Sequence, residues 1–314
     1  MKIRIGTRAS QLARWQADWT AKELERLGFS VSIIPIITAG DRLQKGPVPS
    51  PPHLLSVGVF TKEIQQALLN GEIDLAVHSL KDLPTDAVPG LTLSAVPRRA
   101  AVEDVLVLSK DFSENQNPPV SLADLPPNAV LGTGSLRRRA QISASRPDLI
   151  LRDIRGNLNR RLEKLDAGDF DALILAQAGL ERLGWTHRIS AKISTEIILP
   201  AVGQGALGLE TRTDDTFTRQ ALAPLNDPET FACVAAERAM LKALDGGCTT
   251  PIGGLCRTEN GELTLTGRVI AVNGREMVQK SIRGRDPQAL GETLAGELLE
   301  MGAGTYIAEA RGKC

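Results

Sequence analysis

The beginning of the chain alternates strand, helix and strand, and this order constrains the fold more than any other feature. Residues Lys2 to Gly6 form a predicted short strand, and a helical spacing of apolar residues runs from Gln11 to about Leu27, where Gly28 ends it. A second strand is expected from Val31 to Ile37. A strand, a helix and a strand in this order form a sheet with helices packed on it. The sequence therefore predicts an α/β fold.

A second series of alternating strands and helices follows residue 100, and the pattern changes again near residue 226, where a helix is expected from Asp227 to Leu244. A chain of 314 residues is too long for one ordinary core, so two or three domains are predicted. The strands expected after residue 100 lie at 105–108, 130–132, 149–154, 172–175, 206–210, 263–270 and 277–282.

A single cysteine, Cys248, lies between two glycine pairs just beyond the helix predicted for 227–244. Gly246 is expected to end that helix, because glycine tolerates a positive φ, and the glycines leave room for a bulky group. Three roles fit Cys248: a small buried hydrophobe, a catalytic thiolate, or a point of covalent attachment. The negative partial charge of a helix C-terminus disfavours a thiolate, whereas attachment needs access and space.

Polar residues follow two of the predicted strands at the expected carboxyl edge of the sheet. Arg8 and Ser10 follow the first strand, and Lys81 and Asp82 follow a buried strand at 74–77. Ligands bind at this edge in open α/β sheets, near the free N–H groups of helix N-termini. A solvated arginine and a solvated turn are the alternative interpretations of Arg8 and of the Lys81–Asp82 pair.

Arginine is concentrated between residues 131 and 161, which contain eight arginines, two aspartates and no lysine. Several of these arginines open helices, where the helix dipole disfavours cations, so their placement costs stability unless an anion binds. The guanidinium group binds carboxylates and phosphates through two parallel hydrogen bonds. A polyanionic small ligand is therefore preferred over the alternative, a nucleic-acid patch.

The composition limits the partners further. Lys+Arg and Asp+Glu both number 37 and aromatic residues make up only 3%, so neither bulk charge nor base stacking favours nucleic acid or a membrane surface. The first residues lack the apolar core of a signal peptide, and no apolar run approaches a membrane span. The four cysteines form no metal or disulfide pattern. A cytoplasmic protein without a metal, a nucleic-acid partner or a membrane partner is predicted.

Six separate stretches resemble motifs of the porphobilinogen deaminase (hydroxymethylbilane synthase) family. They occur in the family's order and cover nearly the whole chain, and the set is specific although each stretch alone is weak. The stretches are Gly6–Ser10, Ala76–Pro84, Gly132–Arg138, Leu151–Asn157, Leu199–Ala206 and Gly246–Cys248.

This resemblance implies an α/β fold with two bilobal solute-binding-protein-like (type 2) domains plus a small C-terminal α+β domain. The expected domains are 1–100 with 203–222, then 104–199, then 226–314. It also implies a dipyrromethane cofactor joined to Cys248 by a thioether, and a monomeric enzyme. The implied reaction joins four porphobilinogen molecules head to tail, with loss of ammonia, and water releases hydroxymethylbilane.

The family's site residues are carried over motif by motif. Asp82 matches the catalytic carboxylate, which stabilises positive charge beside the pyrrole nitrogens and handles protons. The residues expected to hold carboxylates of cofactor and substrate are Arg8, Ser10, Ser79, Lys81, Thr133, Ser135, Arg137, Arg138, Arg155, Arg161, Arg182 and Gln204.

Two positions depart from the family's pattern. The family's lid usually reads Gly-Lys-Gly-Leu-Phe, whereas Ser56–Phe60 lacks the lysine and follows a proline-rich stretch, and Gly134 replaces a common serine. Two other functions remain as alternatives: a bilobal anion- or solute-binding module without catalysis, and an enzyme that uses Cys248 as a nucleophile in each turnover. The first leaves Cys248 and the third domain unexplained, and the helix C-terminus argues against the second.

Overall fold

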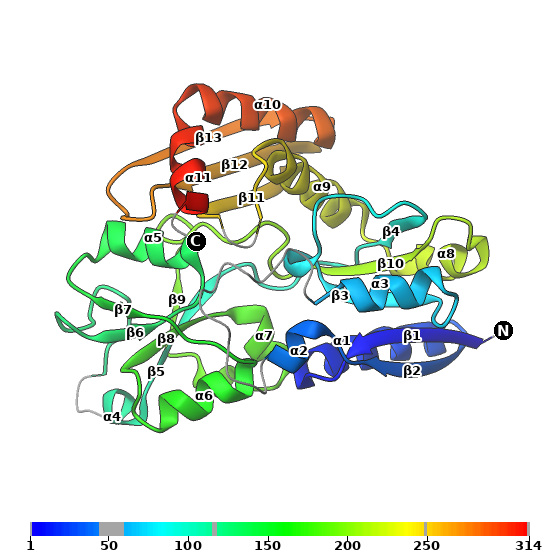
Figure 1. The fold of residues 1–314 in the computed structure, drawn as a ribbon, viewed down its shortest axis with the longest axis horizontal. Coiled ribbons are helices and arrows are strands. Elements are labelled where there is room, and N and C mark those ends of the chain that lie inside the picture. The colour runs from blue at the N-terminus through cyan, green and yellow to red at the C-terminus, as the bar shows by residue number, and fades with distance from the viewer. Residues whose placement is uncertain (1, 44–59, 115–117, 248–249, 313–314) are drawn as a thin grey trace.

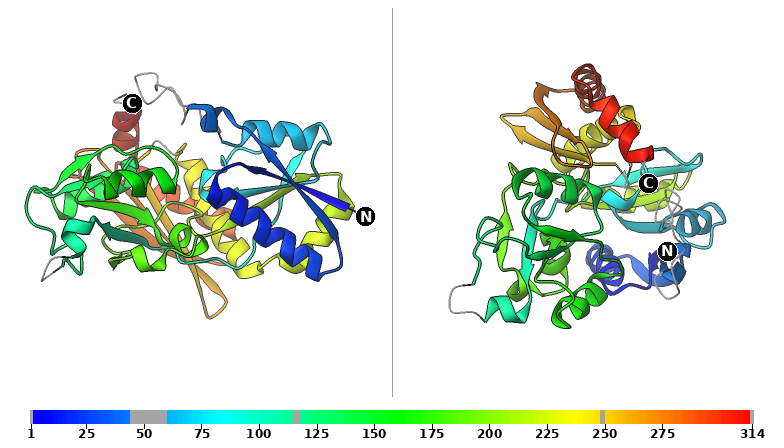
Figure 2. Two further views of the ribbon diagram at one scale, coloured as in Figure 1. Left: turned by 90° about the horizontal axis from the view of Figure 1, so that it is seen from below. Right: turned by 60° about the vertical axis from the view of Figure 1, so that its left-hand side comes forward.

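The computed structural model describes residues 2–43, 60–114, 118–247 and 250–312. Cys248 and most of the predicted lid, residues 44–59, therefore lie outside the described residues. The chain forms two α/β lobes that lie side by side, with a smaller third domain packed across them (Figure 1 and Figure 2). The predicted α/β class with an additional small α+β domain is confirmed. No helix in the described ranges is long and apolar enough to cross a membrane.

The first lobe is one mixed sheet of five strands with helices packed on it. Its elements are β1 (Lys2–Arg8), α1 (Gln11–Arg26), β2 (Ser30–Ile36), α2 (Ala39–Leu43), α3 (Lys62–Leu69), β3 (Leu75–Ser79), a 3-10 helix (Leu80–Asp82), β4 (Leu91–Ala95), β10 (Leu207–Arg212) and α8 (Thr216–Leu222). The strand order is β2-β1-β3-β10-β4, and β10 runs antiparallel to both of its neighbours. The chain therefore leaves this lobe after β4 and returns to it with β10.

The second lobe is also a mixed five-stranded sheet with helices packed on it, and it is formed by the part of the chain between β4 and β10. Its elements are β5 (Asp104–Leu108), α4 (Lys110–Ser113), β6 (Val130–Gly132), α5 (Leu136–Ser145), β7 (Ile150–Arg152), α6 (Leu158–Asp166), β8 (Ala172–Ala176), α7 (Gln177–Arg182), a 3-10 helix (Thr186–Arg188) and β9 (Ala191–Ile193). The order is β7-β6-β8-β5-β9, with β6 parallel to β7 and β8. In both lobes the carboxyl ends of parallel strands lead into predicted site residues.

The third domain is an antiparallel three-stranded sheet packed on two long helices. Its elements, after a 3-10 helix (Ala223–Leu225), are α9 (Pro228–Ala243), β11 (Ile252–Glu259), β12 (Glu262–Ile270), β13 (Met277–Gly284), α10 (Pro287–Glu300) and α11 (Ala303–Gly312). Its core includes the fully buried Met240, Leu265 and Leu294. The strand β11 was not predicted, because two glycines directly follow its first residue and its pairing with β12 depends on the tertiary fold.

Glu237 of α9 attaches the third domain to both segments that connect the lobes. Its buried carboxylate accepts hydrogen bonds from Arg99 Nη1 at 2.6 Å and Nη2 at 3.0 Å, from the Gly203 N–H at 2.8 Å and from the Cys256 N–H at 2.9 Å. A buried ion pair is tolerated when its remaining hydrogen-bonding groups are satisfied, as they are here. The third domain is thus fixed to the same segments through which the lobes are joined.

The end of α9 differs from the prediction. Asp245, not Gly246, has the positive φ of 51° after the helix, and aspartate tolerates this conformation better than most side chains. Arg311 pairs with the Asp245 carboxylate. A Cβ on Gly246 would lie 2.5 Å from the Leu241 side chain and 2.6 Å from that of Ile252. Gly246 therefore permits close packing instead of supplying the left-handed turn.

The apolar side predicted for α1 is only partly directed at its own sheet. Leu24 is fully buried in the first lobe, but Leu12 and Trp15 are half-buried. A Cβ on Gly179 of α7 would lie 3.8 Å from Leu12, and the Arg182 guanidinium lies 5.9 Å from the centre of the Trp15 ring. These apolar residues therefore contribute to the contact between the two lobes.

Candidate active site

The first part of the site is a pocket at the carboxyl edge of the first sheet, between α1 and α3. The end of β1 supplies Arg8, and Ser10 caps α1 by accepting a hydrogen bond from the Ala13 N–H at 3.4 Å. The fold thus brings together four predicted site residues from two separate motifs: Arg8 and Ser10 from the first, and Ser79 and Asp82 from the second. The pocket is lined by Arg8, Ser10, Gln16, Phe60, Ser79 and Asp82, among others.

Asp82 lies on the 3-10 helix that directly follows β3, and it is half-buried. Within the described part of the chain its carboxylate has no hydrogen-bond or ion-pair partner. The nearby His78 is buried and already paired, with its Nε2 3.0 Å from Glu210 Oε2, as expected for a structural histidine. Asp82 is therefore the acidic group of this pocket that is available to a ligand.

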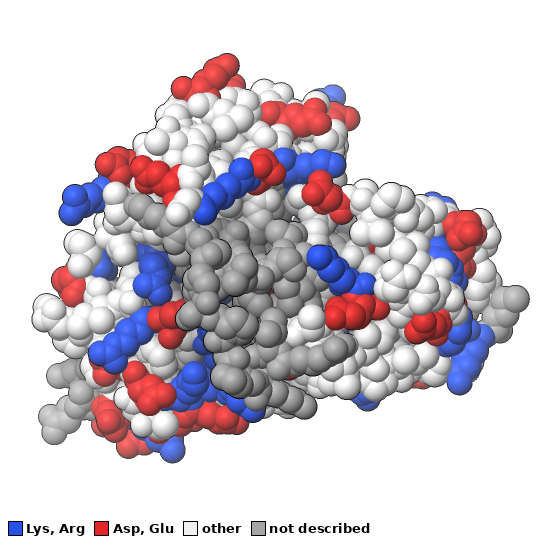
Figure 3. Space-filling view, in the orientation of Figure 1, with Lys and Arg blue, Asp and Glu red and all other residues white. Residues whose placement is uncertain are grey.

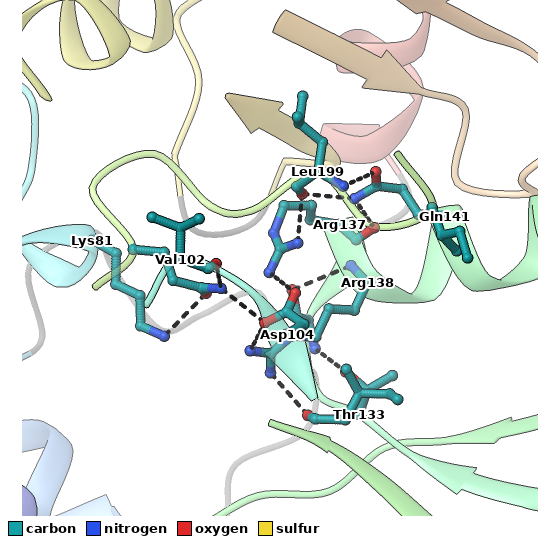
Figure 4. A network of polar contacts seen from close by, with 12 residues as sticks. Lys81, Val102, Asp104, Thr133, Arg137, Arg138, Gln141 and Leu199 are labelled. Carbon is teal, nitrogen blue, oxygen red and sulfur yellow. Dashed lines mark hydrogen bonds and ion pairs between the residues drawn. The ribbon is translucent and has the colours of Figure 1, made fainter. Parts of the chain in front are cut away.

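The second part of the site is a buried network around Asp104, the first residue of β5 (Figure 4). Arg137 Nη2 donates to Asp104 Oδ2 at 2.9 Å, and Arg138 Nη2 donates to Oδ1 at 2.7 Å. The opposite Nη1 groups donate to the backbone carbonyls of Leu199 at 2.7 Å and Ile174 at 3.0 Å. Burial alone would raise the pKa of Asp104, but the two guanidinium groups lower it well below its usual range.

This network changes one expectation drawn from the sequence. From the sequence, the arginines at the start of α5 were expected to need a bound anion to offset their unfavourable position. In the structure, the carboxylate of Asp104 supplies part of that negative charge. Two guanidinium groups share one carboxylate, which leaves one positive charge uncompensated. The Nε of Arg138 is buried and has no hydrogen-bond partner in the described ranges. A ligand carboxylate would therefore still find an attractive environment here.

Lys81 and Gln204 connect this network to the Asp82 pocket. Gln204 Nε2 donates to Asp104 Oδ1 at 2.9 Å, and Lys81 Nζ lies 3.5 Å from Gln204 Oε1. Burial of the ammonium group, together with the charges of Arg138 and Arg137, lowers the pKa of Lys81 from 10.5 to about 8, although Asp82 and Asp104 act in the opposite direction. A cation with so low a pKa lacks a fully compensating anion in its surroundings.

The remaining arginines fall into two groups. Desolvation and the charge of Arg138 lower the pKa of Arg161 to about 10, and desolvation lowers that of Arg182 to about 10. Each of these two guanidinium groups donates to a backbone carbonyl, of Gly156 and Gly205 respectively, and neither forms an ion pair with a described residue. Arg155 instead pairs with Asp153 at 2.9 Å on a more exposed surface. The structure brings Arg161 close to the site but does not place Arg155 in either cluster.

Thr133 and Ser135 shape the turn between β6 and α5. Ser135 caps the helix by accepting from the Arg138 N–H at 3.4 Å, and Thr133 Oγ1 accepts from the Ser135 N–H at 3.3 Å. Gly134 between them has a steric role, because a Cβ there would lie 2.7 Å from the Ile154 carbonyl oxygen. Gly134, where this chain departs from the family pattern, thus allows the backbone around Ile154 to approach closely.

Cys248 lies outside the described residues, but the backbone on either side of it is placed. The Gly247 N–H donates to Thr250 Oγ1 at 2.9 Å, and the Thr250 hydroxyl donates to the Gly247 carbonyl at 2.7 Å. A Cβ on Gly253 would lie 2.9 Å from the Leu199 carbonyl oxygen. The second glycine pair therefore allows β11 to pack against the segment that connects the lobes.

Sequence reasoning missed two residues of the site. Asp104 is fully buried between two guanidinium groups, and its only signal was an acidic residue at the start of an apolar strand. Gln16 was counted within an amphipathic helix, yet it is 1% exposed and its Nε2 donates to Ser79 Oγ at 2.8 Å. Both are buried polar residues, and such residues need a hydrogen-bonding partner.

The fold and the site define a two-lobed α/β protein with buried cations beside a carboxylate that has no partner among the described residues. The model of "Porphobilinogen deaminase, dipyromethane cofactor binding domain" matches residues 3–220, and that of "Porphobilinogen deaminase, C-terminal domain" matches 231–300. This chain belongs to the porphobilinogen deaminase family.

Relatives and solved structures give further comparisons. The porphobilinogen deaminase of Pelobacter propionicus is 44% identical over 98% of this chain and 97% of its own length. That of Chlorobaculum parvum is 45% identical over 100% of this chain and 99% of its own. An ancestral cationic amino acid solute-binding protein, AncCDT-1, is 14% identical, with a TM-score of 0.43 over 71% of this chain and 87% of its own.

Proposed function

We propose that this chain is a hydroxymethylbilane synthase, which joins four porphobilinogen molecules head to tail with loss of four ammonia molecules. The observation that carries the proposal is the set of incompletely compensated cations beside a free carboxylate. Arg138 lies within electrostatic range of both Lys81 and Arg161, and Asp82 acts on the same two residues. Each porphobilinogen carries an acetate and a propionate, so the substrate and the growing product supply the missing negative charge.

The same cations fit the dipyrromethane cofactor, which is a tetracarboxylate. We assign its carboxylates to Arg137, Arg138 and Lys81, with Thr133, Ser135 and Gln204 nearby, and its covalent attachment to Cys248. The bound cofactor supplies the pyrrole α-carbon on which the chain is built. The lowered pKa of Lys81 supports this assignment, as does the Nε of Arg138, which has no hydrogen-bond partner in the part of the chain that the structure describes. Both groups would gain from a carboxylate partner.

Asp82 is assigned the catalytic role, and Arg8, Ser10, Ser79, Arg161 and Arg182 are assigned to substrate carboxylates. Arg155 is assigned to a substrate carboxylate on its motif alone, because in this structure it pairs with Asp153. When porphobilinogen loses ammonia, positive charge develops next to its pyrrole nitrogen. A carboxylate at that position stabilises the charge and can exchange a proton with the nitrogen or the leaving amine. The half-buried position of Asp82, which has no partner among the described residues, supports this role.

The division into domains, the oligomeric state and the location are part of the same proposal. We divide the chain into 1–100 with 203–222, 104–199 and 226–314, supported by the membership of the three sheets. We propose a monomer that acts in the cytoplasm. The buried thiols of Cys233 and Cys256, which are free, agree with a reducing compartment.

The alternatives are an anion-binding module without catalysis and a nucleic-acid patch. On the face shown in Figure 3, basic and acidic side chains are interspersed, which disfavours a broad basic surface. Formation of hydroxymethylbilane from porphobilinogen by the purified protein would separate the enzyme from the binding module. Binding of porphobilinogen without product formation would contradict the proposal.

Replacement of Arg161 by lysine tests whether a guanidinium group is required. We expect Arg161→Lys to raise the KM for porphobilinogen about tenfold, because lysine cannot form two parallel hydrogen bonds to one carboxylate. Arg160→Lys is the matched control, because Arg160 is the neighbouring, exposed arginine of α6. A nucleic-acid patch would instead tolerate both changes equally and would bind DNA with a steep salt dependence.

The low pKa of Lys81 predicts a pH effect. Above pH about 8 the site without cofactor loses the Lys81 charge, so the rate at which the apo-protein takes up preformed hydroxymethylbilane to form its cofactor should fall as the pH rises through this value. Lys81→Gln should start from a lower rate and lose this decline, whereas Lys164→Gln, at an exposed position on α6, should keep it. The measurement is the rate of cofactor incorporation, followed by intact mass, between pH 6 and 9.5. An unchanged decline in Lys81→Gln would assign the titration to another group.

A further inference from the structure

Arg8 has a carboxylate partner within the chain, and their geometry leaves part of the guanidinium group free. Arg8 Nη2 lies 2.6 Å from Asp41 Oδ1, and Arg8 Nε lies 3.2 Å from the same oxygen. Asp41 of α2 thus occupies the side of the guanidinium group formed by Nε and Nη2. Across the described ranges, Nη1 of Arg8 makes no hydrogen bond or ion pair.

Asp41 is itself held in a fixed position. The Thr38 hydroxyl donates to Asp41 Oδ2 at 2.8 Å, and the Thr38 N–H donates to the same oxygen at 3.3 Å. Burial raises the pKa of Asp41, but the hydrogen bonds and charge of Arg8 and the hydrogen bonds of Thr38 outweigh burial and lower it. The carboxylate is therefore ionised at neutral pH. The side chains of Arg8 and Asp41 are only 18% and 15% exposed, so the pair is shielded from much of the solvent.

Phe60 restricts Arg8 from a second direction. The centre of its ring lies 4.0 Å from Arg8 Cζ, so the guanidinium group rests on the aromatic face. A long side chain that is paired along one edge and stacked on one face has little conformational freedom left to lose on binding. Its free end can then bind a carboxylate at a lower entropic cost.

We propose that Asp41 is a positioning residue, which holds the Nε side of Arg8 so that the Nη1 end meets a substrate carboxylate in the pocket. This inference rests on the proposed function, in which Arg8 binds a carboxylate of porphobilinogen. Asp41 acts through Arg8 and touches no reacting atom. The opposite role, a competitor that occupies the place of the ligand carboxylate, predicts tighter substrate binding once Asp41 is removed.

Asp41→Asn distinguishes these roles. We expect the KM for porphobilinogen to rise about tenfold, as for the loss of one charge-assisted hydrogen bond, while kcat changes less than about twofold. In an Arg8→Gln background, where KM is already raised, Asp41→Asn should add no further increase. Thr38→Val, which removes one hydrogen bond to Asp41 and preserves the shape of the side chain, should raise KM in the same direction by a smaller factor.

Asp74→Asn is the matched control. Asp74 holds Arg4, on the same strand β1, through the same side of the guanidinium group, with Nε–Oδ2 at 2.9 Å and Nη2–Oδ1 at 2.8 Å. Because this pair does not line the pocket, its loss should leave the KM for porphobilinogen unchanged, even if the thermal midpoint falls.

Each remaining outcome overturns the proposal. A lower KM in Asp41→Asn would make Asp41 a competitor, and an unchanged KM would remove its role. An equal rise in the Arg8→Gln background would indicate general loosening of α2. If Arg8→Gln alone left KM unchanged, the assignment of Arg8 would fail as well. Hydroxymethylbilane formation by the unaltered protein tests the proposed function separately. If Asp41→Asn does not fold, Thr38→Val decides, and an unchanged or lower KM there contradicts the proposal.

Discussion

Cys248→Ser should abolish both the covalent cofactor and the formation of hydroxymethylbilane. A serine hydroxyl is a much poorer nucleophile than a thiol at neutral pH, so the thioether should not form. The intact mass of the purified chain should exceed that expected from its sequence by one dipyrromethane unit, and the variant should show only the sequence mass. The pyrrole colour reaction with an acidic aldehyde reagent should be lost in parallel.

Cys233→Ala is the control for this experiment. Cys233 lies on α9, and its thiol is buried in the core of the third domain. The additional mass should therefore remain in Cys233→Ala. An active, unaltered enzyme that carries no additional mass would show that attachment at Cys248 is not part of its chemistry.

Asp82→Asn should lower turnover by about 10²-fold or more, the loss typical when a proton-transfer or charge-stabilising group is removed. Asparagine preserves the size of the side chain but not its charge, so the pocket should keep its shape. The cofactor should still be present if the variant receives preformed hydroxymethylbilane during assembly. The measurement is single-turnover and steady-state product formation on protein whose mass confirms the cofactor.

Asp86→Asn is the matched control for Asp82, because Asp86 lies four residues further on and its side chain is 89% exposed. Turnover within about twofold of the unaltered protein is expected there, as for most exposed positions. If both substitutions gave near-normal turnover, Asp82 would be a turn residue without a catalytic role.

The alternation of strands and helices predicted the two lobes well, because local apolar spacing is enough to indicate a strand such as β6 or a helix such as α5. The strand β11 and the positive φ of Asp245 could not be predicted in this way. Strand β11 depends on its pairing with β12. The positive φ falls on Asp245 because Gly246 is packed closely against Leu241 and Ile252.

In the candidate site, too, local sequence predicted some residues, whereas others depend on contacts between distant parts of the chain. Motifs predicted Asp82, Arg137 and Arg138 as site residues, because these residues stand at the end of a predicted strand or at the start of a helix. Asp104 and Asp41 were missed because each is defined by a partner far away in the sequence, Arg137 in one case and Arg8 in the other. Only the folded chain shows that some of the predicted ligand-binding arginines already have a carboxylate beside them.

The position of β10 has a consequence for the order in which the protein can be completed during synthesis. Strand β10 lies between β3 and β4, so the first sheet lacks an inner strand until the ribosome has passed residue 212. All strands of the second sheet, in contrast, come from the continuous stretch 104–193. Domains fold as units while the chain emerges, and unpaired strand edges invite aggregation. The lobe translated second is thus the first whose sheet can be completed, and the lobe that carries Asp82 has an incomplete sheet until β10 has emerged.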